Sequence, residues 1–182
     1  ECKEPVLSEA AFQRNFTNEG GFGKTIRLLK NIMGLWLIQE SRRQWIREGE
    51  NVTFADLERE ALASEPFKCF INPDDPEFMG PGDMPNRIRD YCKRTGQAVP
   101  ESRGSVMRCI YESLALAYRN TKAGIEEITG KKYNAIHVVG GGTKDRLLSQ
   151  FAALCRVDVT LKKPRAPIAA DFDYVAVKLS RT

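Results

Sequence analysis

The chain has 182 residues, of which 42% are hydrophobic and 29% are charged, and its formal net charge is +4. This composition indicates a globular domain large enough to bury a core, and it excludes a disordered chain. The small, dispersed positive charge argues against nucleic-acid binding, and no apolar run reaches the about 18 residues of a membrane span. The N-terminal stretch ECKEPVLSEAAF is acidic and lacks the pattern of a secretion signal.

Cysteine usage predicts reduced thiols in a cytoplasmic protein. The chain has an odd number of cysteines, none of them in a CxxC motif, and His137 is its single histidine. A zinc site is therefore not expected. The cysteines are Cys2, Cys69, Cys92, Cys109 and Cys155.

The first third of the chain predicts a loop followed by two helices. Residues 1–20 are expected to form a loop with one short turn. In the run KTIRLLKNIMGLWLIQESRRQWIR, apolar residues recur at i, i+3 and i+4, which predicts a helix from Lys24 to Arg47. Thr53 and Asp56 resemble a capping box that opens a second helix, Phe54 to Ser64.

The middle of the chain predicts a loop and two further helices. INPDDPEFMGPGDMP is rich in proline and glycine and is expected to be a surface loop. A helix from Pro85 to Arg94 follows, and then the longest helix, Arg103 to Thr129, which Gly130 should end. One apolar face is expected on the longest helix, made by Val106, Ile110, Leu114, Ala117 and Tyr118.

The last quarter predicts a sheet. Ala135 to Val139 is a strand candidate with β-branched residues, and Thr143 to Leu154 has a helical pattern. Two more strand candidates are Val157 to Leu161 and Tyr174 to Leu179. Although helices dominate, the strand–glycine–helix order predicts an α/β fold.

Three consecutive glycines, Gly140, Gly141 and Gly142, stand between the predicted strand and the next helix. Ligands of open α/β sheets bind beyond the carboxyl ends of strands, and glycine permits a close approach of the backbone to a ligand. The spacing matches neither GxGxxG nor the phosphate loop GxxxxGK[ST]. A ligand wall and a simple tight turn are both open interpretations.

Two amide side chains, Asn31 and Gln39, interrupt the apolar stretch LLKNIMGLWLIQ. On one helix they would lie about 12 Å apart along the axis and could line one cleft. Alternatively, they satisfy neighbouring loop backbone. Gly34 lies between them and costs a helix about 1 kcal/mol, which predicts close packing at that point.

Long stretches of the sequence resemble the FGGY carbohydrate kinases, specifically the rhamnulokinase branch. The similarity is carried by FTNEGGFGKTIRLLKNIMGLWLIQESRRQW, by INPDDPEFMGPGDMPNRIRDYCKRTGQAVPESRGSVMRCIYESLALAYR and by VVGGGTKDRLLSQFAA. It implies part of an actin-like, ribonuclease-H-like ATPase fold, in which two domains enclose ATP and a sugar. The implied reaction is the magnesium-assisted phosphorylation of L-rhamnulose at its 1-hydroxyl, with an aspartate accepting the hydroxyl proton.

The resemblance also implies roles for individual residues. Asn31 matches a sugar-contacting amide, and Gln39 matches an ATP contact. Gly141, with Gly140 and Gly142, matches the backbone wall under the nucleotide. No metal ligand is implied within this chain.

The sequence departs from the family pattern in three respects. The family's phosphate-binding segment, its His-Asp-Thr motif with the catalytic aspartate and its Gly-Thr-Trp-Ser motif are absent, so no catalytic residue is expected here. Asp145 stands where the family tends to have asparagine. Residues 1–153 are expected to form the kinase C-terminal domain without its first strands, and residues 154–182 form a tail that does not match.

Three functions remain open from the sequence. The chain is expected to be part of a sugar kinase that is inactive alone; a non-catalytic nucleotide- or sugar-binding module and a helical interaction protein are the alternatives. Cys92 and Cys109, on consecutive predicted helices, are expected to lie close enough that a disulfide is feasible. The strand Ala135 to Val139, lacking its family neighbours, is expected to cause dimerisation or aggregation, or to pair with the tail as a substitute strand. For the chain as a whole, the missing N-terminal domain and a second copy of the chain are open partners.

Overall fold

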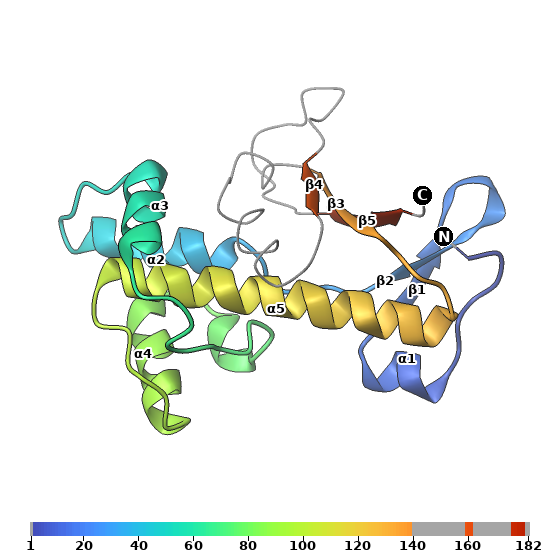
Figure 1. The fold of residues 1–182 in the computed structure, drawn as a ribbon, viewed down its shortest axis with the longest axis horizontal. Coiled ribbons are helices and arrows are strands. Elements are labelled where there is room, and N and C mark those ends of the chain that lie inside the picture. The colour runs from blue at the N-terminus through green and yellow to red at the C-terminus, as the bar shows by residue number, and fades with distance from the viewer. Residues whose placement is uncertain (1, 140–158, 162–175, 181–182) are drawn as a thin grey trace.

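A computed structural model describes residues 2–139, 159–161 and 176–180, and its arrangement is centred on one long helix (Figure 1). Helices α2, α3 and α4 gather around the N-terminal half of this helix, α5, whereas α1 and the β1–β2 hairpin lie at its C-terminal end. The elements in chain order are α1 (Glu9–Gln13), β1 (Thr17–Gly20), η1 (Phe22–Lys24), β2 (Ile26–Leu29), α2 (Trp36–Arg47), α3 (Phe54–Ala63), η2 (Pro76–Phe78), α4 (Met84–Arg94), α5 (Arg103–Thr129), β3 (Ala135–Val139), β4 (Val159–Leu161) and β5 (Ala176–Ser180).

Helix α5 has the bounds that its sequence predicts. The Ser102 side chain accepts a hydrogen bond from the Ser105 amide at one end, and Gly130 adopts the left-handed conformation (φ 64°) at the other. The predicted apolar face is buried at Val106, Ile110, Leu114 and Tyr118, with Ala117 partly exposed. Burial also extends around the helix, because every residue from 106 to 115 is buried. Neighbouring elements pack around this half of the helix, so even its polar side chains are enclosed.

The predicted helix from Lys24 to Arg47 is wrong over its first half. Residues Ile26–Leu29 form strand β2, which pairs antiparallel with β1 in a register that joins Thr17 to Leu29 and Gly20 to Ile26. The hairpin turn passes through Gly23, whose φ is 64°. Glycines at the turn favour a hairpin over a helix, and strand pairing then satisfies the backbone. Helix α2 begins only at Trp36.

The first twenty residues contain regular structure instead of the expected loop. Ser8 caps α1, and β1 follows it. The backbone of Cys2 continues the hairpin, since its amide donates to the Ile26 carbonyl at 2.7 Å and its carbonyl accepts from the Ile26 amide at 2.8 Å.

Helices α3 and α4 agree closely with their predicted ranges. The capping box is confirmed: the Thr53 side chain accepts from the Asp56 amide, and the Asp56 carboxylate accepts from the Thr53 amide. Asp83 caps α4, with Pro85 in its first turn. The core that these helices share with α2 and α5 includes the fully buried Leu37, Leu57, Phe78, Met84, Ile88, Met107, Ile110 and Leu114.

Strand β3 is the central strand of a small sheet whose outer strands come from the tail. It pairs in parallel with β4 and antiparallel with β5. Both described neighbours of β3 thus lie within residues 154–182, so the expected pairing of this strand with the tail is observed. Ile136 on β3 is buried in the main core, so the sheet and the helices pack together in a helix-rich α/β fold.

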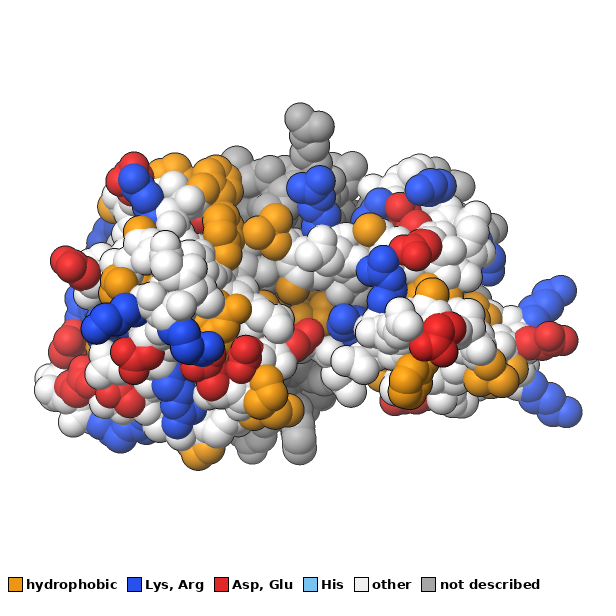
Figure 2. Space-filling model, turned by 90° about the horizontal axis from the view of Figure 1, so that it is seen from below, with side chains coloured by type: hydrophobic (Ala, Val, Ile, Leu, Met, Phe, Trp, Pro, Cys, Tyr) orange, Lys and Arg blue, Asp and Glu red, His pale blue; other side chains and the backbone are white. Residues whose placement is uncertain are grey.

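The described surface carries charges of both signs. Figure 2 shows Lys and Arg side chains interspersed with Asp and Glu on the face that it presents. Within the described part of the chain, no helix is both long and apolar enough to cross a membrane.

Glu126 ties the end of α5 to the connection that leads into β3. Its carboxylate accepts hydrogen bonds from Lys122 Nζ at 2.8 Å and from the Tyr133 amide at 2.9 Å. The Lys122 ammonium, the Tyr133 amide and Lys132 together lower the pKa of Glu126 to about 2 from 4.5. Because the folded-state pKa is depressed, this contribution to stability is complete above pH 4.5 and is lost as the pH falls toward 2.

We expect Glu126→Gln to flatten the acid limb of the stability profile. The urea midpoint of the native chain should fall between pH 4.5 and 2 more steeply than that of the variant. Urea titrations at a series of pH values measure this, with the exposed Glu4→Gln as the control that keeps the native slope. Identical slopes for the native chain and Glu126→Gln would contradict the role given to this carboxylate.

Candidate functional site

Asn31 lies on the segment of residues 30–35 that joins β2 to α2, and its side chain is exposed. The segment itself is held in place. Ile32 and Met33 pack against the core, and the Met33 amide donates to Asp74 Oδ1 at 2.8 Å. An exposed amide on a fixed segment is suited to contact a ligand from outside the domain.

Gln39 lies at the end of the first turn of α2 and is half-buried. Its backbone N–H donates to the Leu35 carbonyl at 2.9 Å, within the first turn of the helix. The expected geometry, with Asn31 and Gln39 on one helix, is wrong because Asn31 precedes the helix. The expected close packing at Gly34 is also wrong, since the nearest atom to an added Cβ there would be the Ile32 carbonyl oxygen at 3.9 Å.

A buried carboxylate next to Gln39, that of Glu40, fixes α2 to the proline-rich loop. Glu40 accepts from the Gly82 amide at 3.0 Å and from Arg47 Nη2 at 2.9 Å, while Arg43 Nη1 lies 3.2 Å from its other oxygen. Burial acts to raise the pKa of Glu40, but these donors outweigh burial and lower it. The sequence analysis missed Glu40, whose partner in the loop is 42 residues away.

The proline-rich loop is well anchored beside this segment. Trp36 Nε1 donates to the Phe78 carbonyl at 3.1 Å, and the Asp75 side chain caps η2 by accepting from Glu77. Asp74 and Asp75 therefore each accept a backbone hydrogen bond that helps to position this loop.

Strand β3 ends at Val139, directly before the three glycines. Gly140, Gly141 and Gly142 lie outside the described residues, as do Asp145 and the predicted helix Thr143 to Leu154. The described part places the strand that leads to the glycines at the centre of the sheet. This is the position from which the carboxyl end of a strand reaches a ligand in α/β folds.

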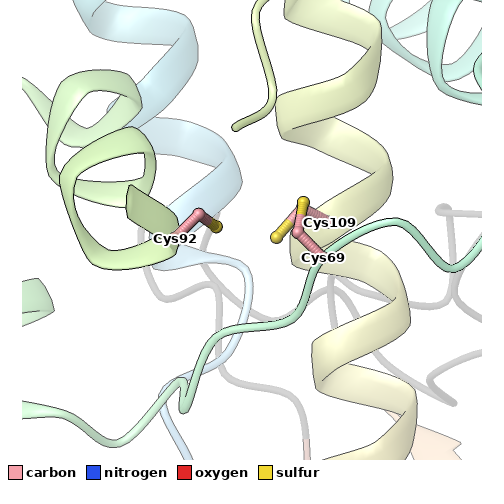
Figure 3. Close-up of side chains that lie close together, drawn as sticks. All are labelled: Cys69, Cys92 and Cys109. Carbon is pink, nitrogen blue, oxygen red and sulfur yellow. The ribbon is translucent and has the colours of Figure 1, made fainter. Parts of the chain in front are cut away.

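Cys92 and Cys109 lie close together, as expected, and Cys69 joins them (Figure 3). All three are buried free thiols, and their sulfur atoms lie within 4.8 Å of one another. Hydrogen bonds from the Cys109 and Cys69 thiols lower the pKa of Cys92, whereas hydrogen bonding to both neighbours, together with burial, raises the pKa of Cys109. Cys69 lies in the connection between α3 and η2. No spacing in the sequence predicted that it would lie next to the other two cysteines.

The comparison with known protein families decides the classification. Residues 1–169 match the model of the FGGY family of carbohydrate kinases, C-terminal domain. The chain belongs to this family. The family assigns the actin-like ATPase fold expected from the sequence, and the described structure is helix-rich with a small sheet.

Curated members of the family are similar to this chain over most of its length. A rhamnulokinase of Bacteroides thetaiotaomicron is 46% identical over 84% of the chain, and one of Enterococcus faecalis is 47% identical over 81%. A rhamnulokinase of Bacillus subtilis is 39% identical over 84%. The chain spans only about 31% of the length of the first of these relatives, so it corresponds to part of a kinase of this family.

Proposed function

We propose that this chain is the C-terminal part of an ATP-dependent ketose kinase, with L-rhamnulose as substrate and its 1-hydroxyl as the phosphoryl acceptor. The observation that supports this most strongly is the 39–47% identity to rhamnulokinases over more than four fifths of the chain. We place the protein in the cytoplasm, and we assign the kinase domain to residues 1–153 and a divergent tail to 154–182.

In this proposal the chain supplies binding surfaces, and the remainder of the kinase supplies the base. Asn31, exposed on its anchored segment, contacts the sugar. Gln39 contacts ATP, and Gly140, Gly141 and Gly142 form the wall under the nucleotide. Phosphoryl transfer depends mainly on positioning and charge stabilisation, which a fixed segment and a bare backbone provide.

Magnesium would neutralise charge on the ATP phosphates. Mg²⁺ prefers carboxylate and water oxygens. Asp74 accepts from the Met33 amide, two residues after Asn31, and Asp75 accepts from the Glu77 amide, so both carboxylates already accept backbone hydrogen bonds. We therefore assign no magnesium ligand from this pair.

The proposal is tested by restoring the rest of the kinase. The chain joined to the N-terminal domain of a rhamnulokinase should phosphorylate L-rhamnulose with ATP and should prefer it to other ketoses, whereas the chain alone should be inactive. Asn31→Ala should raise KM for the sugar more than it changes kcat. No activity on any ketose from a folded fusion would count against the kinase proposal.

The glycine wall is tested separately by Gly141→Val. A valine side chain would occupy the space that the nucleotide base needs, so we expect weaker ATP binding with little change in fold. Calorimetric titration of ATP against the native and variant chains measures this. Equal affinities would remove the glycines from the nucleotide site and leave them as a turn.

A non-catalytic module that binds a nucleotide or a sugar is the second candidate, because the exposed Asn31 on its anchored segment would serve binding alone equally well. Under this alternative the chain binds ATP or the sugar without any partner that completes catalysis. This alternative would be favoured over the kinase by two results together: the chain binds ATP or the sugar, and the folded fusion protein has no kinase activity.

A further inference from the structure

Three thiols from different parts of the fold converge on one point in the core. Cys92 lies on α4, Cys109 lies on α5, and Cys69 belongs to the segment between α3 and η2. Their exposures are 4% or less, and the three sulfur atoms lie within 4.8 Å of one another. Figure 3 shows the Cys92 side chain facing Cys109, with Cys69 next to Cys109.

We propose that Cys69, Cys92 and Cys109 form a binding site for a soft, thiophilic metal ion, held by three sulfur ligands. Thiolate selects soft ions such as Cu(I), Zn(II) and their heavier relatives over hard cations. A metal–sulfur distance of about 2.3 Å places three sulfurs around one ion roughly 4 Å apart. The observed spacing approaches this, so the ligands need to move by only a fraction of an ångström each.

The convergence of three sulfurs distinguishes this site from a disulfide. A disulfide joins two sulfurs at about 2.05 Å and leaves no role for a third. Here the third sulfur lies within the same 4.8 Å limit as the other two. A metal ion uses all three groups, and it would also link α4, α5 and the loop after α3.

A pocket borders the cluster on one side. It has a volume of about 310 Å³ and is lined by Cys69 and Cys109, together with Lys68, Val99, Arg108 and Glu112. Two of the three thiols therefore lie next to a hollow in the surface, while Cys92 lies behind them. Because a metal ion binds thiolate and not thiol, binding would release the thiol protons.

The site is tested with Cd(II) as the probe on the reduced chain, in a Cys2→Ser/Cys155→Ser background that retains only the cluster thiols. We expect one Cd(II) per chain, a sulfur-to-cadmium charge-transfer absorption, proton release and a raised Tm. Zn(II) should compete for the same site. Cys69→Ser in this background should weaken Cd(II) binding by more than about tenfold, because one of three ligands is lost.

The control is the background itself, which should bind Cd(II) as tightly as the chain with all its cysteines. Circular dichroism checks that Cys69→Ser is folded. If this variant does not fold, the charge-transfer absorption and the proton release of the background chain still test the site. Absence of the charge-transfer band, or equal binding by the background and a folded Cys69→Ser, overturns the proposal. Loss of Cd(II) binding only after air oxidation, with recovery on reduction, supports it.

Discussion

Replacing Glu112 with alanine is expected to destabilise the chain by about 3–5 kcal/mol, because it would break a buried ion pair by removing one partner. The Glu112 carboxylate is 2% exposed and accepts from Arg108 Nε at 2.8 Å and from the Phe67 amide at 2.9 Å. The same arginine donates through Nη1 to the Ser64 carbonyl at 2.9 Å, near the end of α3. Loss of Glu112 would therefore leave a guanidinium and an amide in the core without their carboxylate.

Urea unfolding measures this loss. The control is the exposed ion pair of Glu65 and Lys68, on the segment after α3 that also contains Phe67. Glu65→Ala should cost less than about 1 kcal/mol, as is usual for exposed ion pairs. A double variant in which Arg108 and Glu112 both become apolar should be more stable than Glu112→Ala, since no unpaired charge remains. Equal losses for Glu65→Ala and Glu112→Ala would refute the importance of burial here.

Gly104→Ala is the second substitution with a large expected effect, and its sign is opposite to that of helix propensity. In an exposed helix, alanine is favoured over glycine by about 1 kcal/mol. A Cβ on Gly104, however, would lie 2.4 Å from the Glu60 carbonyl oxygen and 2.6 Å from Ser64 Oγ. The carbonyl belongs to α3 and cannot rotate away, so we expect a net destabilisation of about 1–3 kcal/mol.

Gly124→Ala, on the same helix, is the matched control. Its Cβ would meet the Arg14 side chain at 3.2 Å, and a flexible arginine can move aside. This variant should be neutral or slightly stabilising, and thermal unfolding of the two variants compares them. A Gly104→Ala chain as stable as Gly124→Ala would show that α3 and α5 can separate at no cost.

Local signals in the sequence predicted the elements that depend on local chemistry. Ser102 and Gly130 define the ends of α5, and the Thr53–Asp56 capping box opens α3, because caps act within a few residues. The β1–β2 hairpin was missed because the apolar spacing after Lys24 fits a helix, and only pairing with Thr17–Gly20 makes it a strand. Strand identity here depends on a partner, which periodicity does not encode.

The site residues show the same limit. The proximity of Cys92 and Cys109 followed from consecutive helices, but Cys69 reaches them through a loop whose path no motif specifies. The sequence did not predict the roles of Glu40 and Gly104 either. Glu40 accepts from the amide of Gly82, and Gly104 packs against the carbonyl of Glu60, and both partners are distant in sequence. The resemblance to a family supplied Asn31 and Gln39, which spacing alone left open between ligand contacts and loop support.

Because burial is uneven along α5, we expect the backbone hydrogen bonds of its two halves to open with different free energies. A helix of 27 residues extends about 40 Å, yet its fully enclosed part ends near Ala115, and beyond it Tyr118 and Gly124 are the buried positions. Backbone hydrogen bonds in the first half open only when the surrounding helices separate, whereas those near Thr129 can open in local fluctuations. Amide hydrogens should therefore be protected in a gradient along α5, and the end that fluctuates is the one that leads into β3.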